Sequence, residues 1–363
     1  MPKVRVRLFT AHPVKEVLIQ GQKLEIEVFP QDTSGSFLDT ECSIHRSGEF
    51  LSMSIHGARI EGFDSIKVSG ECLAYLPNDS KVRRIPGQLV FIPRIDTELL
   101  VVNVVDMSDY LMGVVHAELG GLEHPNLWST QVVVARTWFS KNQRKFFDKG
   151  ECYAVTDDVQ SQVYAGWPLD SARTLRLRKA VISTGDSILV SRSGVPIDAL
   201  FHANSGGQTM PSGWYFYPRE YLGSVKDVHS LNCSQTNWSK TIPKDYFISQ
   251  MAKWLNQNPE DSKFRAFICS YNQPVRMEYL SYRGNKVRLR VIREHFGLRS
   301  TWFSISEVSG KLLLTGRGYG HGVGLSQEGA FEMAKKGYPV SAITSFYYPG
   351  TRMETWSKAV WKK

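Results

Sequence analysis

The chain has 363 residues, of which 42% are hydrophobic and 12% aromatic, and its formal net charge is +9. These values are typical of a folded chain with one large domain or two smaller ones, and they exclude a disordered protein. The positive charge suggests an acidic partner: a glycan bearing carboxylates, an anionic membrane surface or a nucleic acid. We expect no nucleic acid, because the basic residues are spread along the chain and no nucleic-acid-binding module is visible.

The sequence gives little sign of a membrane span, an export signal or disulfide bonds. No run of 18 apolar residues is present, so we expect no transmembrane segment. The first nine residues alternate like a strand and lack the apolar core of a signal peptide. The five cysteines are far apart and form no Cys-x-x-Cys pair, which argues against a zinc knot. One or two disulfide bonds remain possible, but the sequence does not show which cysteines would pair.

Residues 1–95 are predicted to form a β-rich accessory region, whose role the sequence does not reveal. Short alternating runs are separated there by Gly, Pro, Asn and Asp, as in strands. The runs lie at 4–8, 24–29, 50–55, 65–69 and 89–92. After residue 96 helical and strand patterns mix, which predicts an α+β region over 96–356.

Three helices are predicted in this second region. The first covers 108–119 and stops at Gly120 and Gly121, and the second follows Pro125-Asn126 and runs to about residue 142. The third covers 244–256, and strands are expected at 276–283 and 287–293.

Glu118 lies on the apolar stripe of the first predicted helix. Leu111, Val114, Val115 and Glu118 are spaced at i, i+3, i+4 and i+7. Desolvation and the negative end of the helix dipole both disfavour a charged carboxylate, so both should raise its pKa. A general acid working near neutrality needs that elevation. The competing interpretation is a helix-end glutamate that pairs with an arginine or turns to solvent.

Glycine occupies every second position of Gly-Arg-Gly-Tyr-Gly-His-Gly-Val-Gly at 316–324. In an extended backbone this spacing leaves one face without side chains, so a ligand or another part of the chain must approach closely. Neither a P-loop nor a dinucleotide fingerprint is present. A short helix should follow, with Ser326 as its N-cap and Gly337 past its end. A packing seam and a ligand-facing loop remain equal alternatives.

Six blocks resemble, in order, the motifs of the stage II sporulation protein D family. The resemblance covers about residues 96–352, with leucine at position 325 for the commoner methionine. The blocks lie at 103–118, 131–137, 156–166, 201–209, 298–303 and 320–327, and a Tyr-Tyr-Pro-Gly-Thr ending follows at 347–351.

The resemblance implies a lytic transglycosylase of peptidoglycan that acts outside the cytoplasm on glycan strands, preferably without stem peptides. Glu118 matches the family's catalytic glutamate. It would protonate the oxygen between N-acetylmuramic acid and N-acetylglucosamine, then accept the proton of the muramoyl C6 hydroxyl as a 1,6-anhydro end forms. No second acid has a comparable claim, Glu123 and Asp109 being nearest. The alternatives are a non-catalytic amidase enhancer, with an N-acetylmuramoyl-L-alanine amidase as partner, and a muramidase that uses water.

The resemblance also implies a glycan-binding groove. Arg136 would bind a lactyl carboxylate or steady a carboxylate within the protein, and Gln131 and Tyr164 would orient sugar groups or support the fold. Ser205 is a poor candidate nucleophile, since it lies three residues from His202 and no Gly-x-Ser-x-Gly elbow is present. The predicted substrate-binding residues are Gln131, Arg136, Tyr164, His202, Ser205, Gly206, Gly207, His321, Ser326 and Gln327.

Some members of this family carry zinc ligands directly before the Gln-Val-Tyr block. Here Gln160 and Ser161 occupy those positions, and neither side chain is a good zinc ligand. We therefore expect no metal and no other cofactor.

Overall fold

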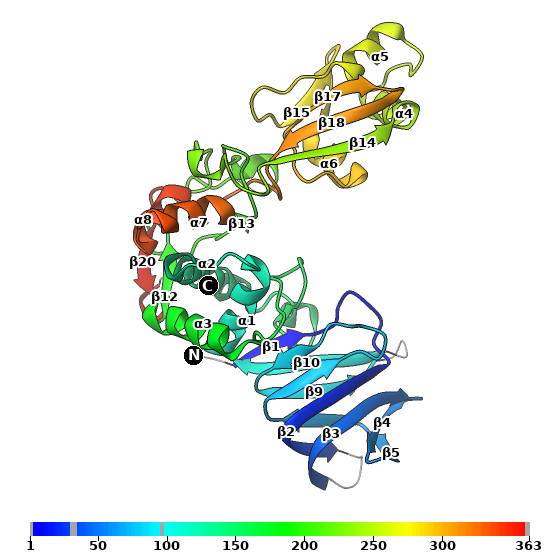
Figure 1. Cartoon of the computed structure of the whole chain (residues 1–363), viewed down its shortest axis with the longest axis vertical. Helices are drawn as coiled ribbons and strands as arrows, with labels where there is room; N and C mark the ends of the chain where they lie inside the picture. The colour runs from blue at the N-terminus through cyan, green and yellow to red at the C-terminus, as the bar shows by residue number, and fades with distance from the viewer. Residues whose placement is uncertain (1–2, 30–34, 95–97, 360–363) are drawn as a thin grey trace. The chain divides into compact units, whose positions relative to one another are not determined.

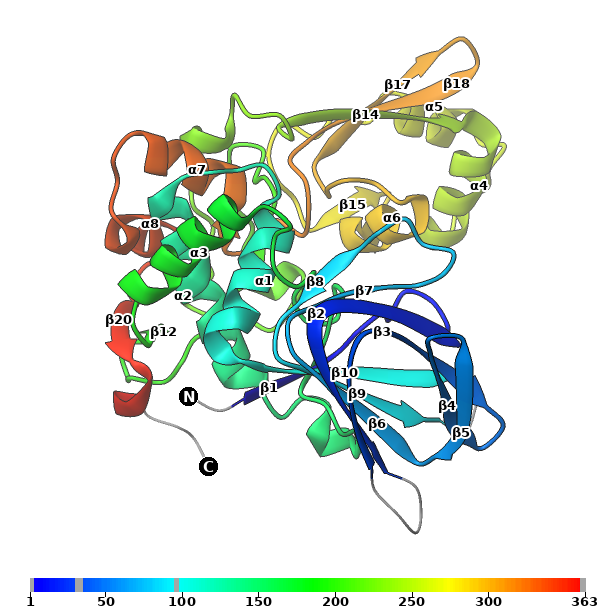
Figure 2. The ribbon, with the colours of Figure 1, turned by 60° about the horizontal axis from the view of Figure 1, so that its bottom comes forward.

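Alternating apolar residues near the start of the chain form strands of one large sheet in the computed structural model, which describes residues 3–29, 35–94 and 98–359. The hydrogen-bonded order is β11-β1-β10-β9-β6-β2-β3-β4-β5, and β7 pairs with β2 and β8 (Figures 1 and 2). The strands are β1 (Lys3–Arg7), β2 (Glu16–Phe29), β3 (Gly35–Ser47), β4 (Phe50–Ile55), β5 (Ala58–Phe63), β6 (Ser65–Ser69), β7 (Cys72–Tyr75), β8 (Arg83–Ile85), β9 (Gln88–Pro93), β10 (Leu99–Asp106) and β11 (Val155–Thr156).

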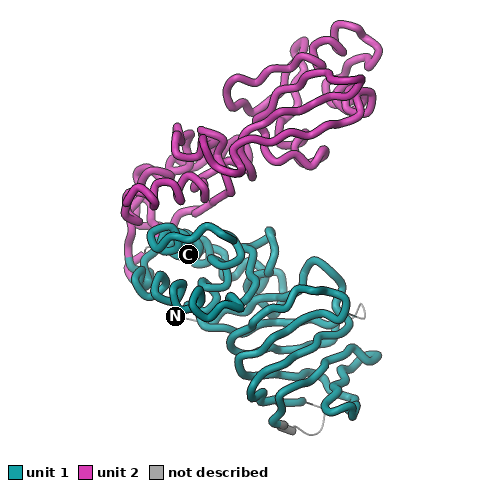
Figure 3. The backbone as a smooth tube through the Cα atoms, in the orientation of Figure 1, with its two compact units in different colours: residues 1–188, 355–357 teal, residues 189–354, 358–363 magenta. Residues whose placement is uncertain are grey.

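The sheet joins the N-terminal residues to the region that follows them. β1 pairs antiparallel with β10 and parallel with β11, so it lies between two strands of the predicted second region. Four of the five predicted N-terminal runs lie within strands and the fifth, 4–8, extends one residue past β1, and the α+β class is confirmed. The predicted boundary at 95/96 falls outside the described residues. The chain instead divides after Ile188 into residues 1–188 with 355–357 and residues 189–354 with 358–363 (Figure 3).

Three helices complete the first unit: α1 (Met107–Leu119), α2 (Pro125–Asn142) and α3 (Ser171–Ser183). The first matches its predicted bounds within one residue and the second within two. The third was not predicted. Its N-cap is Asp170, whose carboxylate accepts the backbone N–H of Ala172 and of Arg173. The three helices pack against one another.

The second unit contains an antiparallel sheet with the order β14-β18-β17 and a core that includes Phe247, Phe264 and Leu314. The predicted helix over 244–256 is confirmed as α4. The predicted strand over 287–293 is wrong beyond Arg288, because Leu289, Ile292 and Phe296 have helical spacing and are buried on one face of α6. These elements are β14 (Asn237–Pro243), α4 (Lys244–Leu255), α5 (Ser262–Cys269), β15 (Tyr279–Tyr282), β16 (Asn285–Arg288), α6 (Leu289–Phe296), β17 (Phe303–Val308) and β18 (Lys311–Arg317).

The last part of this unit brings two distant motifs together. β13 pairs in parallel with β19, so His202 stands opposite Ser326. Ser326 is the N-cap of α7, as predicted, and accepts the N–H of Gly329 at 3.4 Å. The remaining elements are β12 (Ser187–Val190), β13 (Phe201–His202), β19 (Leu325–Ser326), α7 (Gln327–Lys335), α8 (Val340–Tyr347), β20 (Arg352–Thr355) and the 3-10 helices Phe147–Lys149, Ser212–Trp214, Val228–Ser230 and Trp356–Lys358.

Candidate active site

Glu118 lies in the last turn of α1, one residue before the buried Leu119 and two before Gly120, whose positive φ of 52° ends the helix. Its Oε1 accepts the backbone N–H of Val163 at 2.8 Å. Burial raises the pKa of the Glu118 carboxyl to about 7, while the Val163 N–H opposes this rise, and no cation contributes. The group forms no ion pair among the described residues and is only partly exposed to solvent.

The segment around Val163 is held by the buried side chains on either side of it. Gln162 donates to the Tyr110 hydroxyl and to the Ala135 carbonyl, both at 3.3 Å. Tyr164 donates to Asn103 Oδ1 at 2.7 Å, and its ring stacks on Tyr110 with centroids 5.6 Å apart. Because Gln162 and Tyr164 point into the core, the Val163 N–H between them is left to face the carboxylate. The structure thus gives Tyr164 contacts inside the protein.

A second anchor ties this segment to the N-terminal sheet. The carboxylate of Asp157 accepts the N–H of Phe9 at 2.7 Å and of Thr10 at 3.2 Å, and Arg83 donates to it at 2.6 Å. The Asp157 carbonyl in turn accepts the N–H of Tyr164 at 3.2 Å. Residues 1–95 therefore help to position the donor to Glu118.

Arg136 and Gln131, both on α2, are buried. Arg136 is 1% exposed and donates to the Ser187 carbonyl at 2.9 Å and to Thr184 Oγ1 at 3.1 Å. Burial lowers its pKa to about 10. Gln131 is 0% exposed, and its amide has no hydrogen-bond partner among the described residues. Neither side chain reaches solvent in this arrangement. The two hydrogen bonds of Arg136 stabilise the junction of α3 and β12.

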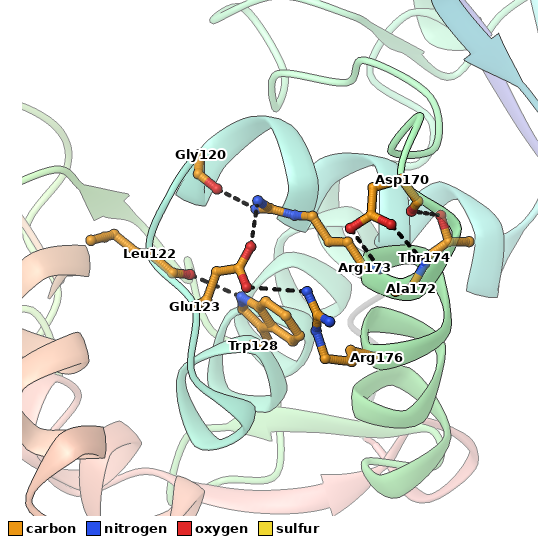
Figure 4. Close-up of polar contacts among 9 residues, drawn as sticks. All are labelled: Gly120, Leu122, Glu123, Trp128, Asp170, Ala172, Arg173, Thr174 and Arg176. Carbon is orange, nitrogen blue, oxygen red and sulfur yellow. Dashed lines mark hydrogen bonds and ion pairs between the residues drawn. The ribbon is translucent and has the colours of Figure 1, made fainter.

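The two acids nearest to Glu118 in the sequence are placed differently from it. Glu123 accepts from Arg173 at 2.8 Å and from Arg176 at 3.2 Å, so it is held as a carboxylate against α3 (Figure 4). Asp109 precedes Glu118 by nine residues on the same helix, about 13 Å along the axis at 1.5 Å per residue. Neither forms a close carboxyl pair with Glu118.

In the second unit, the alternating glycines are a packing seam. A Cβ atom on Gly316 would lie 2.1 Å from the Trp238 ring, one on Gly320 2.8 Å from His202 Cβ, and one on Gly324 2.0 Å from the Leu200 carbonyl oxygen. The predicted extended backbone is wrong after Arg317, where β18 ends. From Gly318 onward the glycines adopt positive φ, which other residues rarely do.

The two predicted histidines lie together beside this seam, with ring centroids 5.6 Å apart. His202 Nδ1 donates to the Val323 carbonyl at 3.1 Å, so Nε2 is unprotonated, and it has no partner among the described residues. His321 Nδ1 accepts the N–H of Val323 at 3.0 Å. Burial lowers the pKa of His321 to about 4 and holds that of His202 well below its ordinary value, so both are neutral at pH 7.

The polar turn after β13 is a buried network. Ser205 Oγ donates to Asp227 at 2.7 Å and lies 2.6 Å from Ser230 Oγ, while its N–H donates to Ser326 Oγ at 3.1 Å. No hydrogen bond joins Ser205 to His202 among the described residues. Ser205 therefore lacks the adjacent histidine that a Ser-His nucleophile requires.

Three further predicted binding residues belong to the same network or border it. Gly206 and Gly207 have positive φ and donate to Asn204 Oδ1 at 2.6 Å and Ser230 Oγ at 2.9 Å, respectively. Gln327 is 5% exposed. The structure thus gathers these groups in one place, where their contacts lie within the protein.

An aromatic run missed by the sequence analysis lies next to His321. Its letters, Trp-Tyr-Phe-Tyr at 214–217, were a visible signal. Phe216 is 40% exposed and meets the His321 ring edge-on at 5.2 Å, and Tyr215 lies 6.0 Å from it. Arg293 donates to the Tyr215 hydroxyl at 2.8 Å. Exposed aromatic rings beside cations supply a surface that the buried turn lacks.

Sequence similarity to known proteins covers the segment that carries Glu118. Residues 95–190, which include Glu118 and the Val163 segment, match the family model for SpoIID, stage II sporulation protein. The stage II sporulation protein D of Bacillus subtilis is 27% identical over 303 residues, 80% of this chain and 86% of that protein. That of Bacillus amyloliquefaciens is 29% identical, over 69% of this chain and 74% of that protein. Residues 95–190 thus carry the SpoIID family's pattern, and the chain is similar to stage II sporulation protein D over most of its length.

The amidase enhancer of Bacillus subtilis is also similar, with 25% identity over 64% of this chain. The match spans 39% of that longer protein. Among the described residues of this chain, no helix is long and apolar enough to cross a bilayer. All five cysteines are free thiols in this structure.

Gln160 and Ser161 stand where the resemblance suggests zinc ligands, and both form hydrogen bonds within the protein. Ser161 Oγ accepts the N–H and the hydroxyl of Thr156, both at 3.0 Å, and Lys145 donates to the Gln160 carbonyl. The described residues contain no group of three or more His, Cys, Asp or Glu that could hold a metal ion. The residues present do not fit zinc, and the expectation that the protein needs none stays a prediction.

Proposed function

We propose that this protein is a lytic transglycosylase that cleaves peptidoglycan glycan strands with Glu118 as its one acid and base. The observation that carries the proposal is the carboxyl group of Glu118, which is largely buried, accepts a single N–H and has a pKa near 7. A carboxyl poised at neutrality can give up a proton and take one back within a turnover.

In the proposed reaction, protonated Glu118 donates its proton to the oxygen that links muramoyl C1 to the next sugar, and the C1–O bond breaks. The Glu118 carboxylate then accepts the proton of the muramoyl C6 hydroxyl as O6 bonds to C1. The products are a free hydroxyl on one strand and a 1,6-anhydro end on the other. Water is not consumed, and Glu118 returns to its protonated form.

The need for only one carboxyl group agrees with the surroundings of Glu118. Glycosidases that use water or a covalent intermediate usually place two carboxyl groups about 5 to 10 Å apart. Glu123 is committed to two arginines, and Asp109 is several turns away on α1. An internal hydroxyl as nucleophile removes the need for a second base.

The proposal extends to substrate and location. Glycan strands without stem peptides would expose the lactyl carboxylates that suit a chain of net charge +9. The exposed aromatic run beside His321 could stack on sugar rings in the second unit. Peptidoglycan lies outside the cytoplasm, so the protein would act there, with an amidase as a further proposed partner.

Product analysis tests this function. Denuded glycan strands are incubated with wild type, Glu118→Gln and a control, Glu25→Gln, on an exposed position of β2. Mass spectrometry should find 1,6-anhydro ends with wild type and Glu25→Gln and none with Glu118→Gln. Reducing ends with wild type would instead identify a muramidase. Intact strands that still bind wild type would identify a non-catalytic glycan-binding protein of the amidase-enhancer kind.

A further inference from the structure

Helix α3 presents an outward face that the fold does not cover. Thr174, Leu177, Ala180 and Val181 are buried against the rest of the unit. On the opposite side Leu175 is 56% exposed and Ile182 71% exposed. These two residues are seven positions apart, so they lie along one side of the helix two turns from each other. With Arg176 and Lys179 between them they form a continuous surface, here named the α3 face.

A cavity of about 360 Å³ opens beside this face. Pro125, Trp128 and Ala180 contribute apolar atoms to its wall, and Arg176 and Lys179 also line it. Trp128, which is 2% exposed, donates its indole N–H to the Leu122 carbonyl at 2.9 Å and forms part of the inner wall of the cavity (Figure 4). This volume is at the lower end of the range of ligand pockets, and it suits one large side chain.

The charges around the cavity are mostly positive, although Glu123 lines it and Asp109 pairs with Arg178 at 3.8 Å. α3 carries Arg173, Arg176, Arg178 and Lys179 and no acidic residue within its bounds. Glu123 bonds to the first two arginines and thereby fixes Arg176 near the Trp128 ring, 6.0 Å from the centroid. Lys179 forms no ion pair among the described residues. An occupant that complements this surface therefore carries carboxylates.

We infer that the α3 face and its cavity form a docking surface for a partner protein, which supplies an acidic segment with one large apolar anchor residue. The anchor enters the cavity against Trp128, and the carboxylates meet Lys179 and Arg176. Leu175 and Ile182 cover the apolar side of the segment. An anchor in a pocket with a charged rim is the usual arrangement of an energetically dominant contact.

The shape of the site favours a protein segment over an anionic membrane surface. A cavity of this size receives a single side chain, whereas a bilayer presents a broad plane.

A selection with defined probes tests the inference. A phage library displays 16-residue helical peptides that carry one aromatic or large aliphatic anchor and flanking positions randomised among Glu, Lys, Gln and Ser. Selection on the full chain should enrich acidic peptides. By fluorescence anisotropy, Lys179→Glu and Ile182→Ser should each weaken the best peptide at least tenfold. High salt should weaken it as well, because exposed charges are screened.

Matched controls place the same changes elsewhere: Lys263→Glu on α5 and Leu38→Ser on β3, where Leu38 is 68% exposed. Both should bind the peptide like wild type. All four variants alter exposed side chains, and circular dichroism and thermal unfolding verify that they fold. Enrichment without acidic residues, or equal binding to the α3 variants, would overturn the inference. Sedimentation with phosphatidylglycerol vesicles that is lost in the same two variants would overturn it too, in favour of a membrane surface.

Discussion

At the scale of single residues, Glu118 is made suitable for acid catalysis by burial without a counter-charge. Its last-turn position on an apolar helix face removes water from the carboxyl, and the one N–H of Val163 only partly offsets that loss. A cation beside Glu118 would have lowered this pKa. Arg136 does not do so, because it donates hydrogen bonds to Ser187 and Thr184.

The pH dependence of cleavage follows from this pKa. The resting enzyme must hold Glu118 protonated, and the pKa is raised from 4.5 to about 7. We expect kcat/KM on denuded strands to fall about tenfold per pH unit above pH 7 and to change little just below it. Initial rates between pH 5 and 9 check this. A rate that still rises between pH 7 and 9 would contradict it.

The same carboxyl should lower the stability of the fold at high pH. Between pH 4.5 and about 7 the folded protein retains a proton that the unfolded chain has released, so stability falls as pH rises through this window, by at most about 3 kcal/mol. Glu118→Gln removes the loss. We expect it to be about 1–3 kcal/mol more stable than wild type at pH 8 and about equal at pH 4.5, measured by urea unfolding. Glu25→Gln should show no such difference; an equal gain for Glu118→Gln at both pH values would reject the explanation.

At the scale of elements, α1 and the 162–164 segment work as one assembly. Gly113 on α1 has no side chain because the Tyr164 ring occupies that space. Tyr164 in turn fixes the neighbouring N–H that bonds to Glu118. A glycine inside a helix thus supports a hydrogen bond to a residue more than a turn away.

Gly113→Ala tests this coupling. The added Cβ would lie 2.3 Å from Tyr164 Cε2, so the ring must move and carry the Val163 segment with it. We expect a loss of about 1–3 kcal/mol of stability and of about tenfold or more in cleavage rate. Urea unfolding and product assays measure both. Gly121→Ala is the control, since an added Cβ there meets nothing within 4 Å. Wild-type activity in Gly113→Ala would show that Tyr164 does not position the donor.

At the scale of the whole molecule, the N-terminal sheet is part of the fold that carries Glu118. β10 leads directly into α1, and its two hydrogen-bonded neighbours, β1 and β9, both come from the first 95 residues. Arg83 and the backbone of Phe9 and Thr10 also hold Asp157.

Removal of residues 1–95 should therefore disrupt the first unit and abolish cleavage. β10 would lose both partners, and Asp157 would be left without its donors. Circular dichroism and limited proteolysis of the 96–363 fragment should show loss of structure around α1 and α2. Co-expression of 1–95 in trans should restore part of it. A fragment that cleaves glycan at the wild-type rate would instead show that the sheet is dispensable.

Local pattern was enough to predict the elements whose residues interact with near neighbours. The apolar spacing and end signals of α1, α2, α4 and α7 predicted their bounds, and the position of Glu118 on the apolar stripe predicted the direction of its pKa shift. The mixed fold class and the family resemblance followed from the same kind of information. Each depends on contacts within a few residues or on the order of motifs, which the chain carries directly.

Long-range packing determined the rest. The donor to Glu118 comes from Val163, 45 residues later, and Asp157 is held by residues about 150 positions earlier. The glycines after Arg317 serve positive φ and close protein neighbours, where an extended pattern suggested one open face. Arg136 and Gln131 are buried because of what α3 covers. Such contacts depend on which segments the fold brings together, and no local spacing encodes that.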